Sequence, residues 1–224
     1  MNVRRLPAAL LLLLLASCAG LPSITPRDDR GRPEAGDAFG GAHRGFPDGR
    51  WQVLHAIRAE MADGRALVMM GLTLMSARDR THRSVLLTLE GFVVFDAEYD
   101  GRLTVHRALP PFDSPHFAEG LMEDIRLIFF EPDGPVVASG TLKDGGAVRR
   151  HRLPDGGTVD LELLPGDDWR IRRYDPSETL TRTVRATHGR GDQNGFPQAV
   201  ELTAAGGQDY RLTMTLLEAV PASN

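Results

Sequence analysis

The chain has 224 residues, a net charge of −4, 42% hydrophobic residues and 6% aromatic residues. This length provides one sizeable core and is marginal for two domains. The slightly acidic balance and the few aromatic side chains exclude a nucleic-acid-binding surface, which needs basic groups and stacking platforms. The single cysteine excludes an internal disulfide and a thiolate-rich zinc site.

Residues 1–17 have the pattern of a bacterial export signal. Two arginines precede an apolar run over 6–16, which is well short of the roughly 20 residues of a membrane-spanning helix. The tetrad LASC at 15–18 resembles the lipobox of bacterial lipoproteins, in which the signal is cut before the cysteine and the thiol carries a diacylglycerol. The alternative is an ordinary secretory signal with a chance cysteine. We expect lipid attachment at Cys18 and, because Ala19 rather than Asp follows it, an outer-membrane location facing the periplasm.

The segment that follows is expected to be a flexible tether. Residues 18–49 are rich in proline and glycine and have no periodic apolar pattern. Such a segment cannot bury enough apolar surface to offset its ordering entropy. We therefore expect a lipidated cysteine and tether over 18–49, a folded domain over 50–220 and a short tail over 221–224.

The domain reads as a series of short strands. Apolar and polar residues alternate, with turn dipeptides such as Asp100-Gly101 and Gly206-Gly207 between the runs, and this pattern predicts antiparallel hairpins. Residues 51–62 suit either a helix or a strand, and the strand is favoured because Asp63-Gly64 would then form a hairpin turn. The predicted strand runs are 68–74, 85–89, 94–95, 103–105, 159–163, 169–171, 180–186, 200–202 and 210–216.

One segment has helical periodicity instead. Ser114-Pro115 is typical of an N-cap followed by proline at the first helical position. Apolar residues then recur every four positions from Phe117 to Phe129, until the breaker Pro132-Asp133-Gly134. The sequence thus predicts one amphipathic helix between two sets of strands.

These elements predict a mainly β fold with one or two helices. A long sheet with one apolar face must either pack on a second sheet or curl around the helix. We expect a curved antiparallel sheet that forms an incomplete barrel around a central helix. The residues expected to line an apolar cavity against that helix are Val68, Met70, Leu72, Val85, Leu87, Leu121, Ile125, Leu212 and Met214.

No arrangement of residues suggests catalysis. The seven histidines have no metal-site spacing, and no serine lies in a G-x-S-x-G turn. Most histidines are therefore expected on solvated strands or loops. The basic run Arg149-Arg150-His151-Arg152 suits a solvated strand, with the mouth of a cavity as the alternative. We expect no metal, no cofactor and no enzymatic activity.

Two stretches resemble the LolA/LolB-like lipoprotein carriers. GFPQAVELTAAGGQDYRLTMTLLEAV at the C-terminus is similar to the closing hairpin of that fold, and TLEGFVVFDAEYDGRLTV is similar to its hairpin with a short glycine-containing loop. The helix at 114–130 falls where those proteins have their buried plug, so the likeness covers 51–220. The central helical region is shorter than in the characterised receptor, and no position matches the cavity arginine of these carriers.

The resemblance implies an incomplete barrel whose hydrophobic interior takes the acyl chains of a lipoprotein. It also implies that an exposed apolar loop residue inserts into the membrane. The corresponding loop here is Leu89-Glu90-Gly91-Phe92, in which Leu89 or Phe92 is the candidate, although Phe92 also suits a core strand.

Two functions remain open at this stage. The first is an outer-membrane lipoprotein that binds acyl chains as a lipid or lipoprotein carrier or acceptor, with a periplasmic carrier as partner. The second is a non-catalytic structural or assembly lipoprotein whose barrel is fully packed. In either case we expect a monomer that contacts membrane lipid through acylated Cys18 and binds no nucleic acid.

Overall fold

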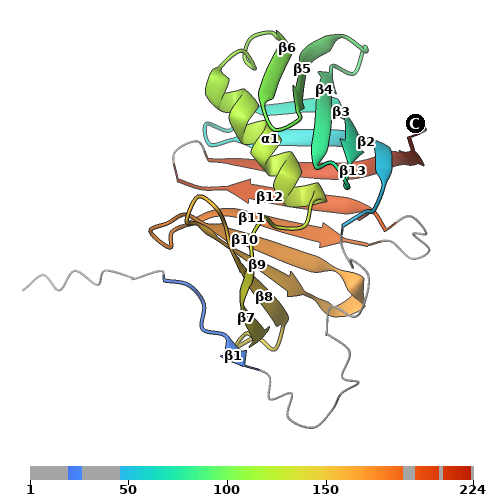
Figure 1. The fold of residues 1–224 in the computed structure, drawn as a ribbon. Coiled ribbons are helices and arrows are strands. Elements are labelled where there is room, and N and C mark those ends of the chain that lie inside the picture. The colour runs from blue at the N-terminus through green and yellow to red at the C-terminus, as the bar shows by residue number, and fades with distance from the viewer. Residues whose placement is uncertain (1–19, 27–45, 189–194, 207–208, 223–224) are drawn as a thin grey trace, which may run out of the picture.

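A computed structural model gives the fold for most of the domain (Figure 1). It describes residues 20–26, 46–188, 195–206 and 209–222. The expected signal over 1–17 and the lipidation site Cys18 lie outside the described residues. Across the described ranges, no helix combines the length and apolar character needed to cross a membrane.

The strands form one 13-stranded antiparallel sheet in the order β1-β7-β8-β9-β10-β11-β12-β13-β2-β3-β4-β5-β6. The expected fold class is confirmed: the protein is mainly β, with a single α-helix among the described residues. The strands are β1 (Thr25–Pro26), β2 (Arg50–Met61), β3 (Ala66–Ser76), β4 (Thr81–Leu87), β5 (Val93–Tyr99), β6 (Leu103–Ala108), β7 (Val136–Thr141), β8 (Ala147–Arg152), β9 (Thr158–Leu163), β10 (Trp169–Tyr174), β11 (Leu180–Thr187), β12 (Ala199–Ala204) and β13 (Tyr210–Pro221). A short 3-10 turn, η1 (Pro165–Asp167), precedes β10.

The two halves of the chain join where β2 and β13 pair along nearly their whole lengths. The register runs from Tyr210 opposite Met61 to Pro221 opposite Trp51. The outermost strands, β6 and β1, do not pair with each other, so the curved sheet remains an incomplete barrel. The connection from β6 to β7 passes through α1 (Pro115–Phe129), which lies across the concave face (Figure 1).

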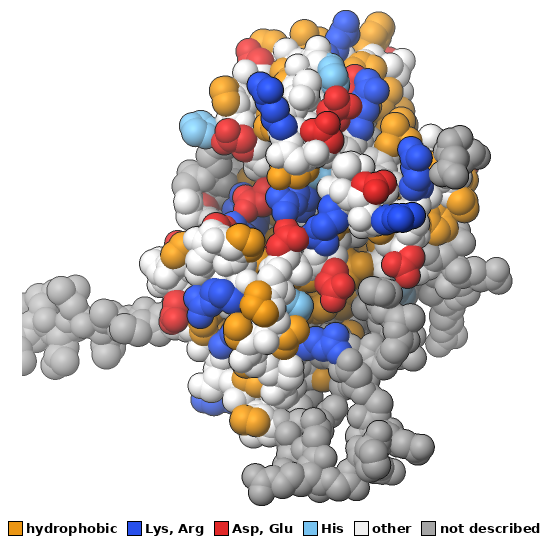
Figure 2. All heavy atoms as spheres, viewed as in Figure 1, with side chains coloured by type: hydrophobic (Ala, Val, Ile, Leu, Met, Phe, Trp, Pro, Cys, Tyr) orange, Lys and Arg blue, Asp and Glu red, His pale blue; other side chains and the backbone are white. Residues whose placement is uncertain are grey.

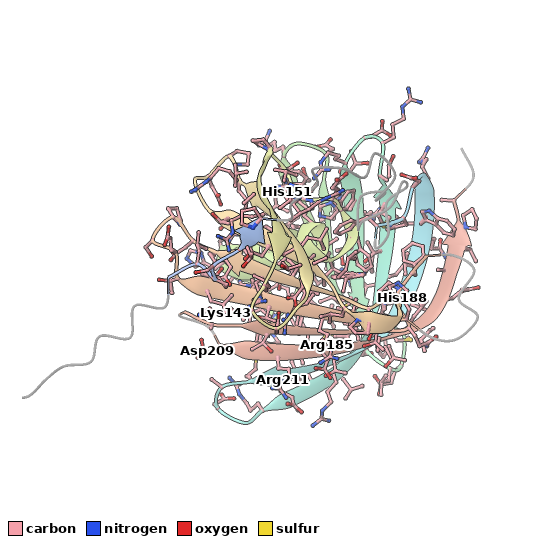
Figure 3. All side chains as sticks on the ribbon, turned by 90° about the horizontal axis from the view of Figure 1, so that it is seen from below. Lys143, His151, Arg185, His188, Asp209 and Arg211 are labelled. Atoms are coloured by element: carbon pink, nitrogen blue, oxygen red, sulfur yellow. The ribbon has the colours of Figure 1, made fainter. Side chains whose placement is uncertain are left out.

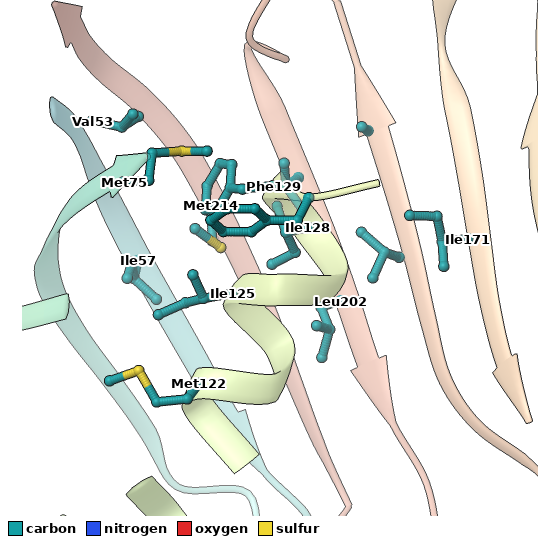
Figure 4. Packing of buried hydrophobic residues seen from close by; sticks show 14 of the residues in the cluster. Val53, Ile57, Met75, Met122, Ile125, Ile128, Phe129, Ile171, Leu202 and Met214 are labelled. Atoms are coloured by element: carbon teal, nitrogen blue, oxygen red, sulfur yellow. The ribbon is translucent and has the colours of Figure 1, made fainter. Parts of the chain in front are cut away.

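The helix forms where its sequence predicts it. Ser114 is the N-cap and its side-chain oxygen accepts a hydrogen bond from the backbone N–H of Phe117 at 3.1 Å, while Pro115 begins the helix. Its apolar stripe packs on the centre of the sheet (Figure 4). Ile125, Ile128 and Phe129 are buried there at 5%, 2% and 2% exposure. This packing, rather than helix propensity alone, holds a helix of this length in place.

Several local predictions agree with the structure and others do not. Residues 51–61 lie in strand β2, Ala62 begins the turn, and the turn at Asp63-Gly64 joins β2 to β3 as expected. Leu89 was expected at the end of a strand, but β4 ends at Leu87 and Leu89 lies in the following turn. The turn begins there because the backbone N–H of Thr88 donates to the carbonyl of Phe92 at 2.9 Å.

The segment expected to be a tether is partly built into the domain. Thr25–Pro26 forms strand β1, and Phe46 is 8% exposed and stacks near Trp169 with ring centroids 5.8 Å apart. The described parts of 18–49 therefore contribute to the fold, because they contain apolar residues that the rest of the domain buries.

The histidines differ most from expectation. His55, His82 and His151 are buried at 1%, 3% and 4% exposure, on strands β2, β4 and β8. They lie on the inward-facing side of these strands, where alternation places every second residue. The expectation of mainly solvated histidines is wrong for these three.

Candidate functional site

The candidate site lies between α1 and the concave face of the sheet. Only those residues of β3 and β4 whose side chains point toward α1 can reach it. On β3 the buried positions include Met69, Thr73 and Met75, and on β4 they are His82, Ser84 and Leu86. Because successive strand residues point to opposite faces, the residues between them face outward. Figure 3 shows the same outward face further along the sheet, where Arg185 and Arg211 point away from α1.

Five of the expected cavity residues are therefore on the wrong side of the sheet. They are Val68, Met70, Leu72, Val85 and Leu87, and Val68 is 50% exposed. The prediction was wrong because β3 and β4 carry apolar residues on both faces. The inward face also contains Gly71, Thr73 and Ser84, so it looks the less apolar of the two in the sequence. A Cβ at Gly71 would lie 2.5 Å from Ile57 Cδ1, so a larger residue at this inward position would require the Ile57 side chain to move.

An apolar cavity of about 220 Å³ lies under the N-terminal half of α1. Its walls come from the helix and from the inward faces of β2, β3, β4 and β13. The apolar residues that line it are Ile57, Ala59, Met61, Met69, Leu86, Phe112, Phe117, Leu121 and Leu212. Met61, Ala205 and Gly206 bring the lining to the end of the sheet that carries the turns 62–65 and 175–179 and residues 205–206 and 209, here called the cavity end.

The remaining expected cavity residues lie beneath the helix. Leu121 and Leu212 line the cavity, and with Ile125 and Met214 they also line a smaller void of about 30 Å³ beside it. Ile125 and Met214 are buried at 5% and 7% exposure. These four come from α1 and from 210–216 of β13, where apolar residues alternate with Arg211, Thr213 and Thr215, so the pattern alone indicated the side.

One polar cluster borders the cavity. Asp124 of α1 accepts a hydrogen bond from Arg182 Nε of β11 at 3.0 Å, and the Tyr210 hydroxyl of β13 donates to its other oxygen. The Arg182 guanidinium lies 5.5 Å from the centre of the Tyr210 ring, and its Nη1 donates to the Thr181 carbonyl at 3.0 Å. All three side chains line the cavity.

Burial shapes the ionisation of this cluster. Asp124 is 2% exposed, and burial raises the pKa of its carboxyl, while the Tyr210 hydrogen bond and the charge of Arg182 act in the opposite direction. Burial also raises the pKa of Tyr210 well above its usual range. The phenol therefore stays protonated, and its O–H donates a hydrogen bond to Asp124. The positive and negative charges are paired, so the cavity can take a neutral apolar chain.

Arg182 is a cavity-lining residue that sequence reasoning missed. No local motif marks it, because its partners Asp124 and Tyr210 lie 58 and 28 positions away along the chain. Within the run 180–186, the sequence indicated only that this arginine belongs to a strand. The single available signal was that Arg182 interrupts an otherwise uncharged inward face with Val184 and Ala186, which are both fully buried.

The expected membrane loop is exposed. Leu89 and Phe92 are 62% and 70% exposed at the β4–β5 turn, so Phe92 is a turn residue and not part of the core. The turn is held by the Thr88 backbone and by the Thr88 hydroxyl, which accepts from the Phe92 N–H at 3.3 Å. Two large apolar side chains are thus presented to solvent by an ordered turn.

Another hollow of about 220 Å³ lies at the C-terminal end of α1, on the face shown in Figure 2 where charged side chains gather. Its arginines pair with neighbouring acids: Arg80 with Asp133 at 2.7 Å and Arg173 with Asp155 at 2.8 Å. Seven of the residues that line this hollow are charged, so it is unsuited to an apolar ligand although these charges are paired. Within the part of the chain that the structure describes, no group of three or more His, Cys, Asp or Glu could hold a metal ion.

Comparison with known proteins places the fold. No family model and no curated protein matches the sequence. A solved LolA superfamily protein from Nitrosomonas europaea is similar with a TM-score of 0.57 and 14% identity, covering 80% of this chain and 89% of that chain. The chain therefore has a LolA/LolB-like fold.

Two further solved structures are less similar. One is described as an outer membrane lipoprotein-sorting protein domain from Vibrio parahaemolyticus, with a TM-score of 0.45 and 10% identity over 77% of this chain and 85% of that chain. The other is a DUF1329 family protein from Desulfovibrio piger, with a TM-score of 0.44 and 9% identity over 79% of this chain and 86% of that chain.

Proposed function

We propose that this protein is an outer-membrane lipoprotein, anchored through Cys18 and facing the periplasm, whose domain binds acyl chains beneath α1. It acts as a carrier or acceptor of lipids or lipoproteins in the cell envelope and performs no catalysis. The observation that carries the proposal is the unfilled apolar cavity between α1 and the sheet. Protein interiors are close-packed, so an unfilled apolar volume that reaches the surface suits a ligand.

The size of the cavity limits what it holds in this conformation. About 220 Å³ is below the 300–1,000 Å³ typical of small-molecule pockets. It therefore takes part of one acyl chain, and a longer chain requires α1 to move away from the sheet. The paired charges of Asp124 and Arg182 leave no net charge to oppose an apolar chain.

The exposed turn supplies a route to the membrane. Leu89 and Phe92 are available for insertion at the headgroup boundary, and burial of one such side chain is worth roughly 1.5–3 kcal/mol. This is sufficient for a transient contact and too little for an anchor. Two or three acyl chains on Cys18 would anchor firmly, at about 0.8 kcal/mol per buried CH₂.

The small cavity volume favours a second candidate, a structural or assembly lipoprotein without lipid cargo. In that case the space under α1 is a packing defect and only the outer surface of the domain matters. The two functions differ in whether the cavity is occupied when the protein is isolated from membranes.

Filling the cavity distinguishes the two functions. Gly120 lines the cavity from α1, and a Cβ there would meet no atom within 4 Å. Gly120→Met should fill the space and also improve helix propensity by up to about 1 kcal/mol. The matched control is Glu119→Met, at an exposed position of the same helix turn.

Native mass spectrometry of the mature chain extracted from membranes measures the lipid-bound fraction. A carrier should show bound lipid in the wild type and in Glu119→Met, and several-fold less in Gly120→Met without loss of thermal stability. A wild-type protein that carries no lipid and takes none from liposomes would support the structural function. Equal lipid in both variants would place the ligand elsewhere.

A further inference from the structure

Residues 20–26 lie on the domain rather than extending from it (Figure 1). Thr25 and Pro26 pair with Thr141 and Gly140 of β7, which adds β1 to the edge of the sheet. Further back along the segment, the Pro22 carbonyl accepts a hydrogen bond from Arg150 Nη2 at 2.8 Å. The segment is thus fixed at two places.

The contact with Arg150 connects the segment to a buried ionic network. Arg150 donates two hydrogen bonds to Asp160, at 2.6 and 2.7 Å, and Glu162 accepts from Arg170 and Arg172 at 2.7–2.8 Å. Asp160 and Glu162 are each 1% exposed, although they lie on the outward face of β9, opposite Val159 and Leu161. Because the guanidinium that pairs with Asp160 also holds Pro22, the segment lies directly beside these charges. Buried pairs of this kind tolerate the loss of one partner poorly.

The start of the segment reaches the cavity end. A Cβ on Gly20 would lie 3.7 Å from Glu178 Oε2 in the 175–179 turn. The register joins this turn to its neighbours: Arg182 is opposite Ala204, Ala204 is opposite Tyr210, and Tyr210 is opposite Met61. Residues 205–206 and 209 therefore lie beside the turns 175–179 and 62–65, and the cavity lining includes Gly206 and Met61, the last residue of β2.

Chain length sets how closely a membrane anchor would hold this end. Gly20 lies two positions after Cys18, and an extended chain spans at most about 7 Å over these two steps. A free linker over the whole of 18–49 would have a root-mean-square reach of roughly 30 Å and would leave the domain free to rotate. With segment 20–26 docked on the domain, the distance from Cys18 to the domain surface is much shorter than this.

We propose that the docked segment 20–26 fixes the orientation of the domain on the membrane, with the cavity end facing the lipid bilayer. This inference rests on the proposed lipidation of Cys18. It deepens the proposed function, because an acyl chain then moves between bilayer and cavity at one end of the molecule.

Single introduced cysteines test the orientation. The chain has one native cysteine, and in the lipidated protein its sulfur is blocked by the acyl anchor, so an introduced thiol is the only free one. Ser177→Cys places a fluorophore in the 175–179 turn, and Arg78→Cys places one in the β3–β4 turn at the opposite end of the sheet; both positions are exposed. The lipidated chain is reconstituted in phosphatidylethanolamine–phosphatidylglycerol vesicles that contain a nitroxide lipid.

The nitroxide should quench the fluorophore at residue 177 at least twofold more than at residue 78. Equal quenching, or stronger quenching at residue 78, overturns the proposal. A chain that lacks the acyl mass and does not float with vesicles instead overturns the lipoprotein assignment, and the two failures are thereby distinguishable.

Substitution of a glycine in β7, at its contact with β1, should displace the segment. A Cβ at Gly140 would lie 2.1 Å from the Thr25 carbonyl oxygen, so Gly140→Ala should expel β1. The control is Ser139→Ala, at an exposed neighbouring position of β7. Hydrogen exchange over 20–26 should be slow in the wild type and the control, and at least tenfold faster in Gly140→Ala.

With the segment released, the difference in quenching between residues 177 and 78 should fall by at least half while flotation with vesicles persists. An unchanged difference would show that the segment does not set the orientation. Wild-type exchange over 20–26 as fast as in an unfolded peptide would show that the segment is not docked, and would also overturn the proposal.

Discussion

His55 and His82 lie under α1 as uncharged side chains. Both pKa values are lowered from 6.5 to about 4, because burial disfavours the imidazolium and, for His82, because the positive charge of Arg126 adds to the effect. His55 lies 5.7 Å from the ring of Phe129, and its Nε2 has no hydrogen-bond partner within the described structure. Protonating either ring therefore favours the unfolded chain.

This predicts acid sensitivity of the fold in a defined window. These histidines bind protons below about pH 6.5 in the unfolded chain but only near pH 4 in the folded chain. The free energy of unfolding is therefore greatest above pH 6.5 and decreases as the pH falls from 6.5 toward 4. Each histidine should contribute a slope of roughly 1 kcal/mol per pH unit. Urea unfolding at a series of pH values measures it. His55→Met should have a shallower slope than the wild type, whereas the exposed His116→Gln should not; equal slopes in all three would contradict the assignment.

The β4–β5 turn gives a second prediction at single residues. Leu89→Glu and Phe92→Glu remove an insertion energy of roughly 1.5–3 kcal/mol, so transfer of an acylated cargo into liposomes should slow about ten- to a hundredfold. Cargo binding and melting temperature should change little, because these side chains are 62% and 70% exposed. Arg102→Glu, in the exposed turn at the other end of β5, is the control. Unfolding of either turn variant, or unchanged transfer in both, would refute the role of this turn.

Among the elements, β4 shows that two neighbouring residues of a strand have opposite environments, because successive side chains point to opposite faces of the sheet. Leu86 is 3% exposed, lines the cavity and faces α1, whereas its neighbour Leu87 faces outward. Leu87 is paired with Met70 and Val93 on the outward side. The two leucines are adjacent in sequence and opposite in environment.

A matched pair of substitutions tests this facing. Leu86→Asp should cost several kcal/mol of unfolding free energy and abolish lipid binding, because the carboxylate would be desolvated without a partner. Leu87→Asp should cost about 1 kcal/mol or less and leave lipid binding near the wild type. Chemical denaturation and native mass spectrometry measure both. A greater cost at Leu87 would reverse the faces assigned to β3 and β4.

For the whole molecule, the prediction concerns location. Cys18→Ser removes the proposed acylation site, and the protein should then appear as a soluble periplasmic chain or an uncleaved precursor. Membrane fractionation with mass determination measures this, and Ser23→Ala, outside the lipobox, is the control. A mature Cys18→Ser chain that still fractionates with the outer membrane would refute the lipoprotein assignment.

The sequence by itself determined the local structure of this protein. Alternation and turn glycines predicted the strands, and the Ser114-Pro115 cap with its apolar repeat predicted α1, because these features depend on neighbours within a few residues. It also indicated the inward residues of α1 and of 210–216 in β13, where apolar and polar residues alternate.

Only the tertiary structure decided the rest. Both faces of β3 and β4 carry apolar residues, so only the packing of the sheet on α1 shows which face is buried. The cluster of Asp124, Arg182 and Tyr210 joins residues far apart in the chain. The docking of 20–26 likewise depends on Arg150, which lies 128 positions after Pro22. These hydrogen bonds join residues that lie far apart in the sequence, and patterns of neighbouring residues do not specify such partners.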